Sequence, residues 1–377
     1  MDLSLHFLSN TVLFVVCLSM GTMFLAFPVP QKSGLRNYKI SLRVLASAYS
    51  ILGLLSMIII VFKIPDNARE HFTFLGIGIS SFQVLLFSSA LITLINPKFV
   101  TFRYLIAQIT PFLFFITFFI LSAKFYGNPV ITHLNEISLY LKNPTLWIRL
   151  LFYGYYIFQL FFYTWLYFNE EKKYKSRALN YFSDEVWLKL TWVRFAFIAA
   201  LAIGTIAMIS CFFPQKYDWI FNLLYTLFYL GFALEYIKYN KIFRLVEPII
   251  VTEKVVPADA NKKPRSKMEW LGLKQQIINN NYYLETGVNI EDIAQRLRIG
   301  RTTLSTFINR EEGVNFNTWI NTMRIEKAKE LLIKNPDEPL SLISEKIGYS
   351  EQSNFSRQFR QITGYAPTLW RQQQGCL

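Results

Sequence analysis

The sequence predicts an all-α protein in two parts: a polytopic bundle of seven transmembrane helices, then a domain of two helix-turn-helix units joined by a long helix. Two observations carry this prediction. Seven stretches before residue 240 are apolar and long enough to cross a bilayer, which takes roughly 20 helical residues. After residue 268, the apolar residues take the helical spacing of a soluble domain, and one pattern of helix, glycine turn and helix occurs twice.

The apolar stretches account for the unusual composition of the chain. Of the 377 residues, 53% are hydrophobic and 17% are aromatic, and this apolar content lies mostly before residue 240. Stretches this continuous exceed what the buried helices of a soluble domain need, so we expect them to span a membrane. They lie near residues 5–27, 41–62, 73–95, 99–122, 147–168, 192–213 and 217–237. The first stretch lacks the charged start and the cleavage site of a signal peptide.

Lys and Arg in the short loops predict the orientation of these helices. The first, third and fifth loops are more basic than the loops between them, and the fifth is the richest, with Lys172, Lys173, Lys175 and Arg177. Because basic loops remain in the cytoplasm, the odd-numbered loops are predicted to be cytoplasmic. Seven crossings of the inner membrane then place the N-terminus outside and the C-terminal domain in the cytoplasm.

Polar residues inside the apolar stretches are few. Gln83, Gln108 and Gln159 lie within them, and a glutamine in hydrocarbon usually hydrogen-bonds a neighbouring helix. The stretch 152–168 is rich in aromatic residues, which are typical of a packed surface or of a pocket for an apolar ligand. A membrane transporter or enzyme would need paired carboxylates, a histidine cluster or charges within the spans, and these stretches are poor in them.

The cysteines and histidines give no sign of a metal or disulfide site. Cys17, Cys211 and Cys376 form no CxxC pair, and the three histidines are isolated along the chain. No zinc-ligand spacing, nucleophile motif or phosphate-binding loop occurs in the sequence. We therefore expect neither an enzyme nor a bound cofactor.

The clearer helix-turn-helix pattern lies in residues 340–364. A first short helix is expected to bury Leu342, Ile343 and Ile347 on one face. Gly348 ends this helix, because glycine readily adopts the positive φ that a tight turn between helices needs. Two short helices separated by such a turn are typical of a helix-turn-helix unit.

The second helix of this unit is predicted to have one buried and one polar face. Ser350 is its candidate N-cap, and Phe355 and Phe359, four residues apart, are expected in the core. The candidate DNA-contacting residues on the opposite face are Gln352, Ser353, Ser356, Arg357 and Arg360. Arg can donate two hydrogen bonds to guanine and Gln can pair with adenine, whereas Arg360 is placed to contact phosphate.

The same pattern occurs earlier in the chain. Leu304 corresponds to Phe355 and Ile308 to Phe359, so both are expected in the core of a first unit. Its second helix should begin near Arg301. The candidate DNA-contacting residues on this helix are Arg301, Thr302, Ser305, Thr306 and Asn309.

A long helix is predicted between the two units, over residues 316–334. At 1.5 Å per residue it would be roughly 28 Å long. Successive major-groove faces on one side of B-DNA are about 34 Å apart. A rigid helix of this length could hold two recognition helices in adjacent grooves.

Residues 268–377 resemble the DNA-binding domain of the AraC/XylS family of bacterial transcription regulators. The resemblance rests on both helix-turn-helix units, on the run from Arg324 to Leu332, and on the ending Gly-Tyr-Ala-Pro-Thr-Leu-Trp-Arg. It implies binding of double-stranded DNA through both recognition helices, and an interaction with RNA polymerase. Thr306 and Asn309 stand where the family often has basic residues, so the first recognition helix is less basic than usual.

Together these features predict three segments: a transmembrane domain at 1–238, a juxtamembrane segment with a basic linker at 239–267, and the DNA-binding domain at 268–377. The predicted function is a membrane-embedded regulator that couples a membrane or extracytoplasmic signal to promoter binding. Its expected partners are DNA, the lipid bilayer, RNA polymerase, an unidentified signal ligand and, as one option, a second copy of the chain. Two alternatives remain: a constitutively tethered regulator whose spans sense nothing, and a transporter or enzyme with a regulatory tail.

Overall fold

The computed structural model describes residues 2–29, 36–62, 73–96, 99, 101–183, 191–210, 218–251 and 267–375. Every regular element in these ranges is a helix, which confirms the all-α prediction. The chain divides into two compact units. The first consists of Met1–Glu171 and Thr191–Val251, and the second of Lys172–Leu190 and Thr252–Leu377.

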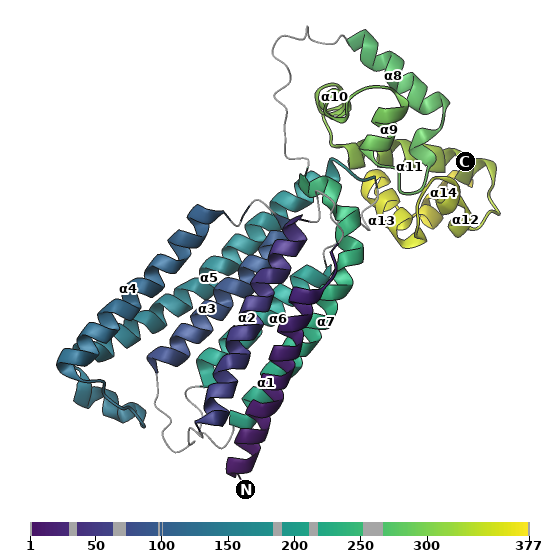
Figure 1. Ribbon diagram of the computed structural model, residues 1–377. Coiled ribbons are helices and arrows are strands. Elements are labelled where there is room, and N and C mark those ends of the chain that lie inside the picture. The colour runs from purple at the N-terminus through teal and green to yellow at the C-terminus, as the bar shows by residue number, and fades with distance from the viewer. Residues whose placement is uncertain are drawn as a thin grey trace. The chain divides into compact units, whose positions relative to one another are not determined.

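The first unit is built from long helices (Figure 1). They are α1 (Asp2–Ala26), α2 (Arg36–Val61), α3 (Phe74–Ile95), α4 (Phe102–Tyr126), α5 (Pro144–Leu179), α6 (Thr191–Ser210) and α7 (Asp218–Val251). A short 3-10 helix, Leu134–Tyr140, precedes α5. The helix α5 continues past Glu171, so its last turns belong to the second unit.

Six of the described helices are long and apolar enough to cross a membrane, not the seven that the sequence predicted. The predicted span at 147–168 is the one that fails, although α5 is a continuous helix there. Tyr and Trp make up much of this stretch, and their polar atoms lower its hydropathy. Arg149 lowers it further and is buried, donating to the backbone oxygen of Pro129 at 2.7 Å.

The prediction that the three glutamines bond neighbouring helices is confirmed. The Gln83 side chain on α3 donates to the backbone oxygen of Ala48 on α2 at 2.9 Å. Gln108 on α4 accepts a hydrogen bond from the Tyr163 hydroxyl on α5 at 2.6 Å. Gln159 on α5 accepts one from Ser81 on α3. Each bond satisfies a polar group that hydrocarbon would leave without a partner.

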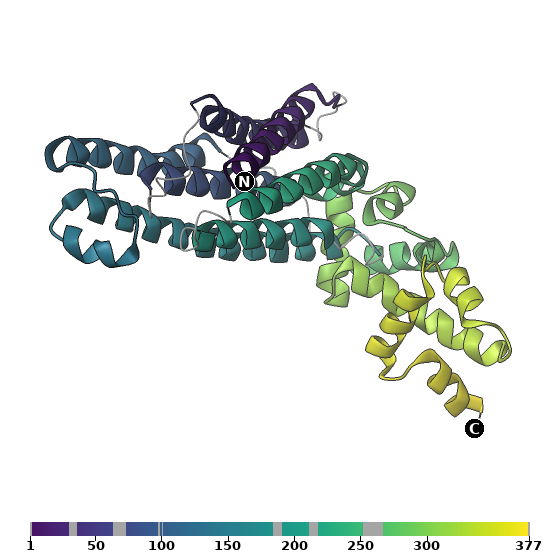
Figure 2. The same cartoon turned by 90° about the horizontal axis from the view of Figure 1, so that it is seen from below.

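Tyrosines also connect the helices of this unit. The helix α1 packs against α2 and α7, and the α1–α2 pair lies side by side in both views (Figures 1 and 2). The Tyr38 hydroxyl on α2 donates to the Tyr236 backbone oxygen on α7 at 3.0 Å, and Tyr49 donates to that of Tyr229 at 2.6 Å. All four rings are buried, so these bonds hold α2 and α7 together in an apolar setting.

The second unit contains short helices around one longer helix. They are α8 (Lys267–Asn279), α9 (Ile290–Arg296), α10 (Arg301–Phe307), α11 (Phe316–Lys334), α12 (Leu340–Lys346), α13 (Gln352–Thr363) and α14 (Pro367–Gly375). The bounds of α11 agree with the predicted long helix. Its buried residues include Trp319, Ile320 and Leu332, which follow the helical spacing seen in the sequence.

Several sequence predictions fall partly or wholly outside the described residues. The predicted juxtamembrane segment begins inside α7, which continues to Val251, and residues 252–266 of the linker lie outside the described part. Cys211 and Cys376 also lie outside it. Among the described residues, no group of three or more His, Cys, Asp or Glu side chains could hold a metal ion.

Candidate nucleic-acid interface

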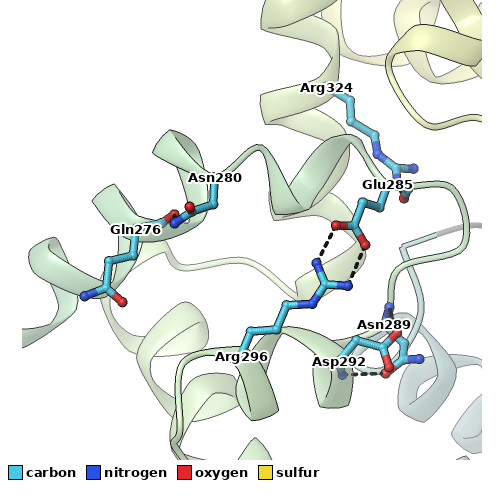
Figure 3. Close-up of polar contacts among 7 residues, drawn as sticks. All are labelled: Gln276, Asn280, Glu285, Asn289, Asp292, Arg296 and Arg324. Carbon is cyan, nitrogen blue, oxygen red and sulfur yellow. Dashed lines mark hydrogen bonds and ion pairs between the residues drawn. The ribbon is translucent and has the colours of Figure 1, made fainter.

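The first helix-turn-helix unit consists of α9 and α10. Asn289 begins α9 with a capping box, shown in Figure 3: its side chain accepts from the Glu291 and Asp292 amides at 2.9 and 3.0 Å, and Asp292 accepts from the Asn289 amide. Such reciprocal bonds satisfy amides that a helix start leaves without partners. The cap fixes where α9 begins and hence how it meets the turn before α10.

The helix α10 begins at Arg301, as the sequence predicted, and continues as a π-helical turn at Ile308–Glu312. Leu304 and Ile308 are buried, which confirms their predicted place in the core. The ring of Phe307, which the sequence did not single out, stacks on Trp270 of α8 with centroids 5.7 Å apart. This contact packs α10 against the opening helix of the domain.

Four of the five candidate DNA contacts of the first helix-turn-helix unit lie on the outer side of α10, and the fifth, Asn309, lies in the π-helical turn that follows it. Thr302, Thr306 and Asn309 are exposed, whereas Arg301 and Ser305 are half-buried. The Thr306 hydroxyl donates to the Thr302 backbone oxygen at 2.8 Å, and the Asn309 amide lies 3.4 Å from the Ser305 hydroxyl. Only one of these five side chains is charged, so this face has less to offer phosphates than a basic helix would.

The second helix-turn-helix unit consists of α12 and α13. Phe355 and Phe359 are fully buried, as predicted, and pack with Ile343 and Ile347 in one core. Two predictions here are wrong. Leu342 is 42% exposed, because it lies one residue outside the buried face of α12. Ser350 is not the N-cap of α13, since the N-cap position is Glu351, whose side chain makes no capping bond to the backbone of the first turn.

The five candidate DNA contacts of α13 also lie on the side away from the core. Gln352, Ser353, Arg357 and Arg360 are exposed, and Ser356 is half-buried. Asn354 accepts a hydrogen bond from the Arg357 guanidinium at 2.9 Å, which orients that side chain. The five positions have the same spacing as the five of the first helix-turn-helix unit: first, second, fifth, sixth and ninth. Both helices thus present equivalent faces, and α13 is the more basic one.

The turn between α12 and α13 is closed against the rest of the domain. Gly348 has a φ of +85°, and a Cβ placed there would lie 2.3 Å from the Leu284 backbone oxygen. Arg324 of α11 is buried beside it and donates to the backbone oxygens of Tyr283 and Glu285, both at 2.7 Å. Figure 3 shows Arg324 reaching from α11 towards Glu285, whose carboxylate pairs with Arg296. Arg324 therefore ties the long helix to the segment before α9.

Residues 181–183, which begin two residues after the end of α5, pack into this domain; we call them the docking segment. Its backbone pairs with the segment before α9, because the Ile290 amide donates to the Tyr181 oxygen at 3.0 Å. The Ser183 hydroxyl donates to the Val288 oxygen at 2.5 Å. The docking segment thus adds a short antiparallel bridge, Phe182 to Asn289, to the first helix-turn-helix unit.

Two buried asparagines of α11 hold the docking segment from the other side. Asn317 donates to the backbone oxygens of Phe182 and Ser183 at 3.1 and 3.0 Å, and Asn321 donates to that of Ser183 at 3.1 Å. Asn321 also accepts from the Tyr349 hydroxyl at 2.6 Å. Since Tyr349 lies in the turn before α13, one continuous set of hydrogen bonds joins the docking segment to the second helix-turn-helix unit.

The docking segment also reaches the first recognition helix. The Arg301 guanidinium lies 5.6 Å from the centroid of the Tyr181 ring, within the range of a cation–π contact. The Tyr181 hydroxyl donates to Glu291 at 3.1 Å. Burial, with the Glu291 carboxylate beside it, raises the pKa of Tyr181, so the phenol keeps its proton and remains a donor.

Sequence reasoning missed this contact and the buried role of Arg324. A signal was present on α11, where Asn317, Asn321 and Arg324 stand at positions i, i+4 and i+7 and so share one face. Polar side chains at helical spacing, next to the buried Ile320 and Ile325, indicate a polar contact inside the domain. The partner of that face could not be read from spacing alone.

Comparisons with known proteins agree with this geometry. The family model described as a helix-turn-helix domain matches residues 293–373. The regulatory protein PocR of Salmonella typhimurium is 28% identical over 131 residues, which are 33% of this chain and 41% of PocR. The arabinose operon regulatory protein of Escherichia coli is 27% identical over 92 residues, 24% of this chain and 31% of that protein.

One solved structure is also similar in sequence. It is the C-terminal domain of AraT, a response regulator from Geobacillus stearothermophilus, with 28% identity and a TM-score of 0.26. The match covers 29% of this chain and 88% of that structure. These matches to relatives and to the solved structure cover between 24% and 33% of this chain. The C-terminal part of this chain, residues 293–373, is thus a helix-turn-helix DNA-binding domain of the AraC type, and the described residues before it include six helices long and apolar enough to cross a membrane.

Proposed function

We propose that the protein is a membrane-embedded, sequence-specific regulator of transcription, whose C-terminal domain binds promoter DNA in the cytoplasm. The observation that carries this proposal is the pair of equivalent outer faces on α10 and α13, on either side of α11 in the sequence. At 1.5 Å per residue, α11 is roughly 28 Å long, which suits recognition helices in successive major grooves. The six apolar helices supply a multi-pass membrane anchor.

DNA binding determines the side of the membrane on which the C-terminal domain must lie. A bacterial promoter is reached only from the cytoplasm, so we place the C-terminal domain there. Six crossings would then put the N-terminus on the same side. The N-terminus outside, which the sequence predicted, requires α5 as a seventh crossing.

We further propose that the docking segment couples the membrane helices to DNA binding. The segment begins two residues after the end of α5, and α5 belongs to the apolar unit as far as Glu171. A shift of α5 would therefore move residues that contact α9, α11 and the Arg301 side chain of α10. An inert anchor needs no such contact, so the docking segment favours a coupled regulator over a constitutive tether.

The ten residues of the two outer faces are the proposed DNA contacts. Arg357 is proposed to read a guanine, and Gln352 an adenine, because their side chains can each make two hydrogen bonds to those bases. Arg360 is proposed to bind a phosphate, which positions the protein without reading sequence. RNA polymerase and a second copy of the chain remain predicted partners.

Arg357 provides the test of sequence-specific binding. For a duplex that the native protein selects from random sequences, Arg357→Ala should weaken binding by about 1–3 kcal/mol and relax the preference at one base pair. Arg357→Lys retains the charge but cannot form the two-bond pair with guanine, so it should lose the same preference. Titration of the full-length protein in nanodiscs with labelled duplexes would measure both effects.

Lys329→Ala is the matched control, because it removes one positive charge from α11 and leaves α13 unchanged. It should alter affinity equally for all sequences, and only slightly. If Arg357→Lys retained full preference for the selected duplex, Arg357 would be a phosphate contact and the proposed base reading would be wrong.

A further inference from the structure

The first unit contains a cavity of about 560 Å³ among α1, α2, α3, α5, α6 and α7. Cavities of roughly 300–1,000 Å³ are the usual size of sites for small molecules. Three of its walls come from segments far apart in the chain: Leu13 of α1, Leu160 of α5 and Tyr229 of α7 all line it. Neither DNA recognition nor anchoring in a bilayer requires a space of this size.

The lining of the cavity contains both polar and apolar side chains. His6 and Asn10 of α1, with Asn222 of α7, line the end at which both of those helices begin. The Asn222 amide donates to the Ser9 hydroxyl at 3.2 Å, which fixes these two helix starts beside each other. Further along the same helices, the lining consists of residues such as Phe228 and Tyr229. A molecule that fills the cavity would therefore meet polar groups as well as apolar ones.

Gln83 supplies an independent sign of a missing partner. Its side chain lines the cavity and is only 7% exposed. Its amide group donates to Ala48, but its oxygen accepts no hydrogen bond from any residue in the described part of the chain. A buried acceptor without a donor is unfavourable, and a ligand hydroxyl or amide N–H would relieve this.

Charge narrows the class of ligand. No Asp, Glu, Lys or Arg occurs among the described residues that line the cavity. A charged head group would thus be buried without a counter-ion, which is strongly unfavourable. Hydrocarbon, in contrast, matches Phe87 and Phe228, whose rings pack together in the lining with centroids 6.0 Å apart.

We propose that this cavity binds a neutral amphiphile, a single hydrocarbon chain with a hydroxyl or amide head that donates to Gln83. Binding of the amphiphile to the cavity does not depend on DNA binding, whereas the role of the amphiphile as the signal rests on the proposed function. Tyr153 and Tyr156 of α5 line the cavity and donate to backbone oxygens of α6, at 3.2 and 2.7 Å. A ligand bound in the cavity would contact α5, the helix that leads into the docking segment.

The test is photolabelling of the full-length protein in phosphatidylcholine nanodiscs with a twelve-carbon alcohol that carries a diazirine in its chain. Labelled peptides are identified by mass spectrometry, and unlabelled dodecanol, dodecane and dodecanoate compete. We expect label on the cavity walls of α3, α5 and α6, and displacement by dodecanol at least tenfold more effective than by the other two. Label spread over exposed side chains of α4, such as Phe114 and Phe118, without competition would overturn the proposal.

Two variants make the result specific. Gln83→Leu should weaken the competition by dodecanol three- to tenfold, which corresponds to the loss of one hydrogen bond. Gln159→Leu is the matched control, because neither Gln159 nor its partners Ser81 and Tyr155 line the cavity, and it should change nothing. Ala200→Phe should fill the space and abolish labelling of its walls.

An unchanged response in Gln83→Leu would contradict the assigned contact. Competition by dodecanoate as strong as by dodecanol would contradict the neutral head group. These measurements use no DNA, so their failure would leave the DNA-binding proposal intact. Conversely, loss of sequence-specific DNA binding would leave a labelled cavity whose output lies elsewhere.

Discussion

Replacement of Gly348 by alanine is expected to unfold the second helix-turn-helix unit. The backbone at this position has a φ of +85°, which disfavours any L side chain. The added Cβ would also lie 2.3 Å from the Leu284 backbone oxygen and 2.9 Å from the Arg324 guanidinium. Strain of about 1–2 kcal/mol and overpacking of about 1–3 kcal/mol together approach the stability of a small domain.

Amide hydrogen exchange of the full-length protein measures this effect. In Gly348→Ala, protection should be lost across α12 and α13 and retained in the apolar helices. Gly364→Ala is the control, because Gly364 has nearly the same φ, +84°, but no atom within 4 Å of an added Cβ. It should reduce protection only slightly. Equal effects of the two substitutions would show that backbone strain alone matters and that the Leu284 contact does not.

Asn321→Leu should release the docking segment. The substitution removes one of the two donors to the Ser183 oxygen and the acceptor of the Tyr349 hydroxyl, and all of these groups are buried. It also removes the donor to the Asn317 side chain, which is the other donor to Ser183. Each buried group that loses its partner costs about 1–3 kcal/mol. The amide of Ile290, which donates to Tyr181, should then exchange much faster. Tyr349→Phe is the control, because it breaks only the second of these bonds and should leave Ile290 protected.

The same variant tests coupling in cells. If the docking segment carries the signal, full-length Asn321→Leu should give the same reporter output as a chain whose first unit is replaced by one unrelated span. Both should differ from the native protein. Identical output from all three proteins would contradict coupling and leave the apolar helices as an anchor.

The predictions that succeeded came from local periodicity. The bounds of α11 and the burial of Phe355 and Phe359 follow from apolar residues repeating every three or four positions. The start of α10 at Arg301 follows from the glycine before it and the apolar positions after it. Such signals depend on neighbours in the chain, so one sequence suffices to read them.

The features that were wrongly predicted or missed depended on more than local periodicity. Tyr and Trp residues of α5 pack well inside a helical bundle but lower its hydropathy, so length alone overstated the number of helices apolar enough to cross a membrane. The docking segment pairs with residues more than a hundred positions later, and no spacing within 181–183 announces it. The candidate DNA contacts could be placed on outer faces from sequence, but which bases they read stays a prediction.

Selection of binding sites by the full-length protein in nanodiscs, from a pool of random duplexes, tests the central claim most directly. Two recognition helices held by α11 should enrich a motif with two half-sites, about 10–10.5 base pairs apart, in successive major grooves. Such a motif is the result that a membrane-embedded, sequence-specific regulator predicts. Retention of duplexes without any enriched motif would mean that the domain binds polyanions without reading sequence, and would contradict it.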